Sequence, residues 1–349
     1  MEKKKIAILF GGCSTEYEVS LQSAYAVIKH VNQSRYETVL IGITRQGEWL
    51  RYNGSLEQIM DDTWSTDPGC VHAVISPSRH VRGVIEFHRD GIKATRIDAA
   101  FPVLHGKNGE DGTIQGLLEL AGIPVVGCGT LSSALCMDKD MAHKIAMQAG
   151  IKVPRSIVVN GKISEGELQQ LVRELSYPLF VKPARAGSSF GITKVEREDG
   201  LFKAAVNALE YDPKVVIEEG IDGFEVGCAV MGNEELIIGE VDEIELSQGF
   251  FDYTEKYTLK TSKIHMPARV DEQTAERIKH TAAAIYKALD CRGFARVDMF
   301  VTPGGELVFN EVNTIPGFTA HSRYPNMLKG IGMSFEEIVD KLIRMAIEE

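Results

Sequence analysis

The stretch FARVDMFVTPGGELVFNEVN, residues 294–313, decides how the C-terminal part of the chain folds. Two runs of strand-forming residues flank the Gly-Gly pair at 304–305. A two-residue Gly-Gly loop between such runs is typical of a β-hairpin, because both glycines can take positive φ. A loop centred on this pair places Asp298 opposite Glu311.

The same register places Arg296 opposite Asn313. Because side chains alternate across a strand, these two residues share one face with Asp298 and Glu311. The other face of the predicted hairpin is apolar and carries Val297, Met299, Val301, Val308 and Val312.

The polar face of the hairpin predicts a metal site. Two carboxylates directly opposite each other repel unless a cation lies between them, and a neighbouring amide oxygen completes a set of ligands that suits Mg²⁺. Phe300 and Phe309 beside this face indicate that it is buried. The magnesium ligands predicted by this geometry are Asp298, Glu311 and Asn313. The alternative is the solvated outer face of an edge hairpin.

The composition sets the class of protein. A chain of 349 residues has room for about two or three domains. Its 49 acidic and 38 basic residues give a net charge of −11, which argues against nucleic acid or an anionic membrane as the main partner. Six scattered cysteines fit reduced thiols in a cytoplasm. The apolar run after the basic start is too short for a signal peptide, so we expect a cytoplasmic protein.

Strand and helix patterns predict an α/β fold. In the first third of the chain, apolar strands alternate with helical stretches, which favours a mainly parallel sheet. A helical stretch from Met137 to Gly150 then separates this part from the next. We expect an N-terminal domain at 1–136, a central domain at 137–240 and a C-terminal domain at 241–349, which meet at a cleft.

Two central segments have the features of a nucleotide site. Residues 177–195 form a strand that ends in Lys182, followed by a small-residue loop whose backbone amides could cover a polyphosphate, although no P-loop pattern is present. Residues 214–230 place Glu218 and Glu219 before a bend and Glu225 after it, where a carboxylate could accept ribose hydroxyls. The alternatives are a plain hairpin and an acidic turn.

Two N-terminal corners carry polar residues after a strand. Glu16 follows Gly11-Gly12 near a predicted helix start, where it could hold an ammonium group or simply complement the helix dipole. His105 lies in the glycine-rich loop of 103–116, which either contacts the same ligand or is a capped loop. A dinucleotide-dependent oxidoreductase is an alternative from the opening pattern, but its GxGxxG fingerprint is missing.

Seven segments follow one another along the chain: GGCSTEYEVSL, HGKNGEDGTIQG, MDKD, KPARAGSSFG, FFDYTEKY, RVDMF and NEVNTIPGFTAHS. In this order they closely resemble the D-alanine–D-alanine ligase family of the ATP-grasp fold, over essentially the whole chain. The resemblance implies that ATP phosphorylates the carboxylate of a first D-alanine and that the amine of a second substrate attacks the acyl phosphate. It also implies a homodimer and two Mg²⁺ ions, with Mn²⁺ as a substitute.

The resemblance assigns roles residue by residue. Glu16 matches the position that holds the first ammonium group, linked to Ser188 and Tyr257. The remaining assignments are Lys256, Arg296 and the backbone N–H of Gly317 for catalysis; Lys139 and Lys182 for phosphates; Glu218, Glu219, Ile221 and Glu225 for adenine and ribose; His105, Asp242, Phe251, Ser322 and Arg323 for substrates; and Asp298, Glu311 and Asn313 for magnesium.

Arg323 departs from the common family pattern, which has an apolar residue here. A guanidinium is costly to bury beside a methyl group and useful beside a hydroxyl, directly or through a carboxylate such as Asp242. The chain is also similar to VanG-type D-alanine–D-serine ligases of vancomycin resistance. We therefore predict D-serine as the second substrate. The alternatives are a D-alanine–D-alanine ligase of normal cell-wall synthesis, a surface role for Arg323, and an ATP-binding sensor without chemistry.

Overall fold

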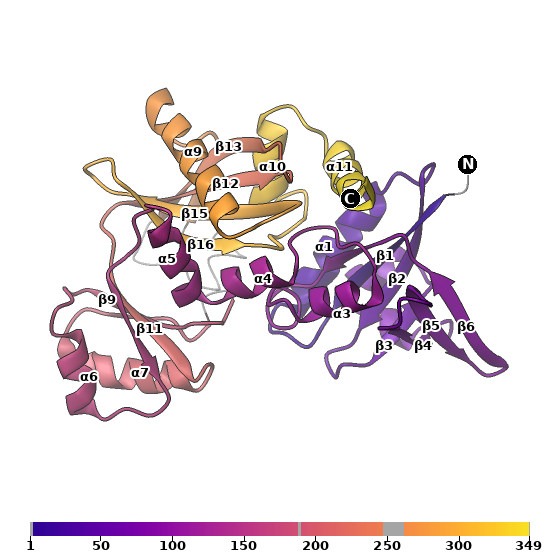
Figure 1. The fold of residues 1–349 in the computed structure, drawn as a ribbon, viewed down its shortest axis with the longest axis horizontal. Coiled ribbons are helices and arrows are strands. Elements are labelled where there is room, and N and C mark those ends of the chain that lie inside the picture. The colour runs from indigo at the N-terminus through magenta and orange to yellow at the C-terminus, as the bar shows by residue number, and fades with distance from the viewer. Residues whose placement is uncertain (1–2, 188–189, 247–261, 349) are drawn as a thin grey trace.

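Three β-sheets with helices against them make up the described part of the chain (Figure 1). The structure is a computed structural model, and it describes residues 3–187, 190–246 and 262–348. No helix in these ranges is long and apolar enough to cross a membrane.

The N-terminal sheet has the strand order β6-β5-β4-β3-β2-β1-β7. The predicted parallel arrangement is present where β1 pairs with β2 and β7. Beyond β2 the strands are antiparallel, so the sheet is mixed. Its elements are β1 (Lys4–Gly11), α1 (Tyr17–His30), β2 (Tyr36–Ile43), β3 (Trp49–Tyr52), α2 (Leu56–Met60), η1 (Trp64–Thr66), β4 (Val71–Ile75), β5 (Gly83–His88), β6 (Gly91–Arg96), β7 (Ala99–Val103), α3 (Thr113–Ala121) and α4 (Thr130–Met137).

The central sheet has the order β10-β9-β11-β8 and is antiparallel. Helices α6 and α7 pack on it through an apolar core that includes Leu168, Val181 and Ala205. Its elements are α5 (Lys139–Gln148), β8 (Ser156–Asn160), α6 (Glu165–Val172), β9 (Leu179–Pro183), β10 (Thr193–Val195), η2 (Glu198–Gly200), α7 (Leu201–Leu209) and β11 (Lys214–Glu219).

The C-terminal sheet has the order β14-β13-β12-β15-β16 and is also antiparallel. Its first strand in the sequence begins at Phe224, before the expected domain boundary at residue 240. The limits of the three domains stay predictions. The elements of this C-terminal part are β12 (Phe224–Met231), β13 (Ile237–Leu246), β14 (Ser262–His265), α9 (Glu272–Ala288), β15 (Phe294–Val301), β16 (Leu307–Asn313), α10 (Arg323–Gly330) and α11 (Phe335–Glu348).

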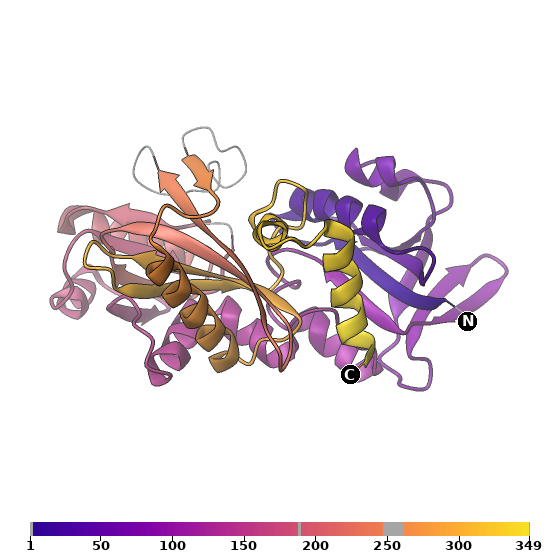
Figure 2. The same ribbon diagram turned by 90° about the horizontal axis from the view of Figure 1, so that it is seen from above.

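The C-terminal helix α11 returns to the N-terminal sheet (Figure 2). Its buried residues, such as Ile338 and Leu342, belong to the same hydrophobic core as Ile6 and Ile8 of β1. Five of the eight β1 residues, Ile6 to Phe10, are fully buried, as expected for a strand covered on both faces. The first and last parts of the chain are therefore packed into one body around β1.

The predicted hairpin of residues 294–313 is present, but its turn differs from the prediction. The pairing of β15 with β16 confirms Asp298 opposite Glu311 and Arg296 opposite Asn313. The prediction of a two-residue Gly-Gly loop is wrong, because β15 ends at Val301 and β16 begins only at Leu307. Of the two glycines, only Gly305 has a positive φ (+76°). The loop is closed instead by a hydrogen bond from the Gly305 N–H to the Thr302 carbonyl (2.8 Å).

A β-bulge restores the predicted register after this longer loop. The pairing shifts by one residue between Asp298 and Met299, which leaves Asn310 as the extra residue of β16. Phe309 therefore lies opposite Met299 in the apolar core, and Val308 lies opposite Phe300 on the polar face. The predicted faces of Val308 and Phe309 are thus wrong, because a one-residue shift exchanges the two faces of a strand.

Candidate functional site

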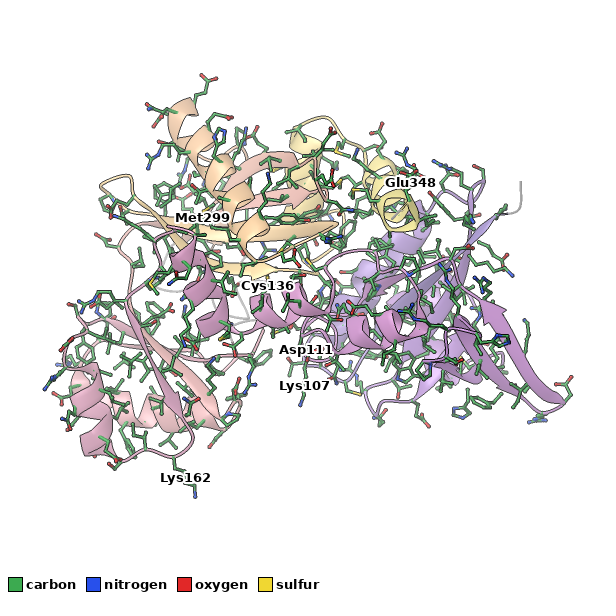
Figure 3. The ribbon with its side chains drawn as sticks, viewed as in Figure 1. Lys107, Asp111, Cys136, Lys162, Met299 and Glu348 are labelled. Atoms are coloured by element: carbon green, nitrogen blue, oxygen red, sulfur yellow. The ribbon has the colours of Figure 1, made fainter. Side chains whose placement is uncertain are left out.

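A cavity of about 360 Å³ lies where the three parts of the chain meet. Helix α1, the loop after β7, the loop after β9 and the C-terminal sheet all contribute to its wall. Figure 3 shows Lys107 and Asp111 of the loop after β7 on the side of the N-terminal part that faces the central part. Of the predicted site residues, the lining includes Glu16, His105, Glu225, Arg296, Asn313, Gly317, Ser322 and Arg323.

On the hairpin, Asp298 is the centre of a buried hydrogen-bond network. It is 1% exposed and accepts hydrogen bonds from the Nε (2.9 Å) and Nη2 (2.7 Å) of Arg296. The Nδ2 of Asn313 donates to the same carboxylate (2.9 Å). Glu311 lies on the neighbouring strand with its Oε2 3.9 Å from the Nζ of Lys139. The four predicted residues are therefore brought together, and Arg296 compensates the Asp298 charge.

The oxygen atoms of this face fit a hard divalent cation. Two carboxylates and one amide, from Asp298, Glu311 and Asn313, lie on one face of adjacent strands, and such oxygen donors suit Mg²⁺. In the described ranges no three His, Cys, Asp or Glu side chains gather as a metal site, and the predicted set contains only two carboxylates. The metal site therefore stays a prediction with a suitable donor set.

Next to the hairpin, Arg323 lies at the start of α10 and is almost fully buried. Its Nε and Nη2 each donate to the Asp242 carboxylate at 2.7 Å. Its Nη1 lies 3.5 Å from Asp298 and 3.6 Å from Glu225. Burial lowers the pKa of Arg323, but the surrounding carboxylates raise it by more, so the pKa lies above its ordinary value and the guanidinium stays charged. We call Arg323, Asp242, Glu225, Asp298 and Arg296 the Arg323 cluster.

The Arg323 cluster packs against Gly227 of β12. A Cβ atom at Gly227 would lie 2.2 Å from Arg323 Nη2 and 2.8 Å from Asp242 Oδ1. The Gly227 N–H also donates to Asp242 Oδ1 (3.0 Å). Gly227 was not predicted as a site residue, although a glycine inside a strand is the expected signal for a close approach of this kind.

Two of the predicted nucleotide residues lie on adjacent strands of the central sheet. Lys182 of β9 and Glu218 of β11 form a buried ion pair with a hydrogen bond. The second oxygen of Glu218 is buried and has no hydrogen-bond partner among the described residues. A buried acceptor without a donor is costly, so a ligand that offers an N–H or O–H donor, as an adenine or ribose does, fits this position.

Other predicted nucleotide residues have partners in the protein. The Lys139 ammonium donates to the Ala186 carbonyl (2.9 Å) in the loop that follows β9. The Glu219 carboxylate accepts hydrogen bonds from the Ser176 N–H (2.8 Å) and Arg155 (3.3 Å). These bonds join the end of β11 to two other segments of the central part of the chain. Ile221 lies in the connection between β11 and β12, and Glu225 lies beside Arg323.

The two acidic residues of the MDKD segment secure the helix that carries Lys139. Asp138 caps α5 by accepting a hydrogen bond from the Met141 N–H (3.2 Å). The Lys214 ammonium lies 2.8 Å from Asp138 and 2.7 Å from Asp140. These contacts tie the start of α5 to β11 and so fix Lys139 next to the central sheet.

Glu16 occupies the N-cap position of α1 without a side-chain capping hydrogen bond, and it is buried at the wall of the cavity. A Cβ atom at Gly187 would lie 2.6 Å from its Oε2, and one at Gly106 would lie 2.5 Å away. Loops from two parts of the chain therefore approach the Glu16 carboxylate closely. Ser188, which the resemblance links to Glu16, lies outside the described residues, as do Phe251, Lys256 and Tyr257.

His105 and Glu110 join the loop after β7 to the segment after β16. The ring of His105 is hydrogen-bonded to the Ile315 carbonyl through Nδ1 (2.8 Å) and to Ser23 Oγ through Nε2 (3.1 Å). Glu110 accepts hydrogen bonds from the N–H groups of Gly106 (2.9 Å) and Ile315 (3.0 Å). His105 thus contacts the protein through both ring nitrogens, and its predicted substrate contact stays a prediction.

The raised pKa of Glu110 predicts that the stability of the folded protein depends on pH. Burial and the nearby Glu16 raise this pKa from 4.5 to about 8, against the opposing effect of Arg296 and the two backbone N–H groups. The folded protein thus holds this proton more tightly than the unfolded chain. Its contribution to stability is present below pH 4.5 and is lost as pH rises toward about 8.

We expect the unfolding temperature of the wild type to fall relative to Glu110→Gln across this pH window. Thermal unfolding of both proteins at matched pH values measures the difference. Parallel curves would contradict the assignment, because the constant cost of the altered hydrogen bond in the variant does not change with pH.

The fold and the site define the class of protein. An antiparallel central sheet that carries Lys182 lies beside an antiparallel C-terminal sheet whose Glu225, Arg296 and Asn313 line the cavity, which is the arrangement of an ATP-grasp ligase. The family model described as D-ala D-ala ligase N-terminus matches residues 5–128, and the one described as D-ala D-ala ligase C-terminus matches residues 145–344. The chain belongs to the D-alanine–D-alanine ligase family and is an ATP-dependent ligase.

Relatives within this family carry several names. The solved structure of the VanG D-Ala:D-Ser ligase from Enterococcus faecalis is 59% identical, has a TM-score of 0.93, and matches 99% of this chain and 100% of its own. The vancomycin/teicoplanin A-type resistance protein VanA from Enterococcus faecium is 44% identical over 100% of both chains. A D-alanine--D-alanine ligase from Caldicellulosiruptor bescii is also 44% identical, over 100% of this chain and 96% of its own.

Proposed function

We propose that the protein joins D-alanine to D-serine at the expense of ATP, through a D-alanyl phosphate, and so supplies a peptidoglycan precursor with lowered affinity for vancomycin. The observation that carries the choice of D-serine is the buried ion pair between Arg323 and Asp242 at the wall of the cavity. The likeness to the VanG D-Ala:D-Ser ligase supports it.

In the first step, Glu16 holds the ammonium of D-alanine, and the carboxylate of D-alanine attacks the γ-phosphorus of ATP. In this proposal Lys139 and Lys182 bind the phosphates, which is supported by the 3.9 Å distance from Lys139 Nζ to Glu311 of the hairpin and by the position of Lys182 on β9 of the central sheet. A C–O–P linkage forms, the bond from phosphorus to ADP breaks, and the negative charge passes to ADP. Mg²⁺ held by Asp298, Glu311 and Asn313 would neutralise the charge that develops on the phosphate oxygens.

In the second step, the amine of D-serine, after loss of a proton, attacks the acyl carbon. The oxygen of the tetrahedral species becomes negative and is stabilised by Arg296 and the Gly317 N–H. Loss of a second proton from the nitrogen and collapse of this species expel phosphate and leave the peptide bond. In this proposal Ser322, whose Oγ would lie 3.0 Å from a Cβ at Gly317, binds the carboxylate of the second substrate.

The Arg323 cluster accounts for the choice of hydroxyl over methyl. Arg323 and Asp242 are nearly or fully buried, so their polar atoms gain little from water. A hydroxymethyl group can both donate to a carboxylate and accept from a guanidinium, whereas the methyl group of D-alanine leaves these groups without a new partner. The alternative function is D-alanine–D-alanine ligation, and several relatives are named D-alanine--D-alanine ligase.

Purified protein incubated with Mg-ATP and D-alanine, with and without D-serine, tests the proposed activity. We expect ADP and phosphate release to depend on D-alanine and to rise with D-serine. A rate of ATP hydrolysis that does not change when D-alanine and D-serine are left out would contradict the proposed activity. Two bound Mg²⁺ ions, use of Mn²⁺, a homodimer and a cytoplasmic location also stay predictions.

A Gly187→Ala variant tests the role of Glu16. The added methyl group would lie 2.6 Å from Glu16 Oε2, so the carboxylate must move away from its position. Overpacking costs about 1–3 kcal/mol, and we expect KM for the first D-alanine to rise by about tenfold or more. Initial rates at varied D-alanine measure it. Gly166→Ala, whose Cβ meets nothing within 4 Å, is the control, and an equal KM in both variants would argue against Glu16 as the ammonium site.

A further inference from the structure

Residues 315–318 carry the Gly317 N–H, and three hydrogen bonds tie this segment to the N-terminal part of the chain. The Ile315 carbonyl accepts from the His105 ring (2.8 Å), and the Ile315 N–H donates to Glu110 (3.0 Å). The Phe318 N–H donates to Ser23 Oγ (3.2 Å). The contacts flank Gly317 on both sides, so the N-terminal part controls where its N–H points.

The hydrogen bonds of Ser23 and His105 form a directed chain. A carbonyl can only accept, so the His105 Nδ1 carries the proton that bonds to Ile315, and its Nε2 is the acceptor. The Ser23 hydroxyl then donates to Nε2 and accepts from the Phe318 N–H. Burial lowers the pKa of His105, which keeps the ring neutral and preserves this order. Each of the two side chains thus donates one hydrogen bond and accepts another.

The side chain of Phe318 fixes the other end of the segment. It is 1% exposed and packs with its ring centroid 5.5–6.1 Å from those of Phe101, Phe294, Tyr324 and Phe335. Ile315 is also buried. The apolar contacts hold the segment in place, while the hydrogen bonds to Ser23 and His105 set the orientation of its peptide groups.

We infer that Ser23 and His105 are positioning residues, which orient the 315–318 segment so that the Gly317 N–H meets the oxyanion of the acyl-transfer step. This inference rests on the proposed function. Neither residue touches the reacting atoms in this role. A displacement of about 1 Å in a catalytic group can cost about a hundredfold in rate, so loss of the Ser23 hydroxyl should slow acyl transfer well beyond its effect on binding.

Ser23→Ala is the test, and Ser20→Ala is its matched control. Both serines are fully buried on α1, but Ser20 bonds to the Val103 carbonyl and the Gly11 N–H and makes no hydrogen bond with residues 315–318. We expect Ser23→Ala to lower kcat for dipeptide formation about ten- to a hundredfold with KM for ATP unchanged. Ser20→Ala should lower the unfolding temperature without this loss of kcat.

A second readout separates the two chemical steps. With D-alanine as the only amino acid, scrambling of ¹⁸O between the bridging and non-bridging β,γ positions of ATP reports acyl phosphate formation. We expect Ser23→Ala to keep this exchange close to the wild-type rate. Equal losses of kcat in the two serine variants, or an unchanged kcat in Ser23→Ala, would overturn the inference.

The His105 variants give an independent result if Ser23→Ala does not fold. Asparagine keeps an N–H donor near the Nδ1 position, and alanine removes it. We expect His105→Asn to retain more of kcat than His105→Ala, and equal rates would count against the inference. Wild-type protein without dipeptide product would instead refute the proposed function, whatever the variants do.

Discussion

Glu311→Ala should abolish ATP-dependent phosphate release, to about a thousandth of the wild-type rate or less. Glu311 faces Asp298 across the β15–β16 pairing and supplies one of the two carboxylates of the proposed magnesium site. Loss of a metal ligand removes several kcal/mol of charge stabilisation, and each 1.4 kcal/mol is about tenfold in rate. The measurement is phosphate release across a titration of Mg²⁺.

Glu306→Ala is the matched control for this variant. Glu306 lies in the loop of the same hairpin and forms an ion pair with Lys152, but both side chains are more than half exposed. Exposed pairs contribute about 0–1 kcal/mol, so we expect a normal rate and nearly normal stability. Near-normal turnover of a folded Glu311→Ala protein in magnesium would show that the hairpin site is wrong.

Arg323→Leu should shift the acceptor preference toward D-alanine. The ratio of kcat/KM for D-serine to that for D-alanine should fall by about ten- to a thousandfold, because a polar subsite loses the group that bonds the hydroxyl. Initial rates with each acceptor at saturating ATP and D-alanine measure the ratio. An unchanged ratio would refute the assignment of Arg323.

The same variant should also lose stability, which requires a companion variant. Asp242 is fully buried and would be left without its guanidinium partner, and breaking a buried pair costs about 3–5 kcal/mol. In Arg323→Leu with Asp242→Asn the charge is gone, while the asparagine Oδ1 can still accept from the Gly227 N–H. We expect the double variant to recover stability and to keep the D-alanine preference. If the double variant prefers D-serine, Arg323 does not determine which acceptor the enzyme uses.

The predicted pairing of Asp298 with Glu311 is correct because two deviations from the predicted hairpin, a longer turn and a bulge, cancel each other. Alternation of polar and apolar residues fixes which side chains share a face, and the turn fixes which residues are opposite. The exact turn could not be predicted, because it depends on one hydrogen bond at Thr302 and on a bulge at Asn310. The bulge cancels the shift from the turn, which is why Asp298 still faces Glu311.

Contacts between distant parts of the chain were harder to predict. Asp242 could be named as one possible partner of Arg323, because a buried guanidinium needs a carboxylate. The pairing of Lys182 with Glu218 did not follow, because it requires the strand order of the central sheet. Ser23 gave no signal in the sequence, since a small polar residue on a helix has many uses and its partner Phe318 lies 295 residues away.

We propose that the cavity selects a second substrate that carries a hydroxymethyl group. The most direct test is a competition with ATP, magnesium, D-alanine and D-serine at equal concentrations, with the dipeptides resolved by mass spectrometry. We predict that D-alanyl-D-serine is the main product at early times. D-alanyl-D-alanine as the main product under the same conditions would contradict the claim.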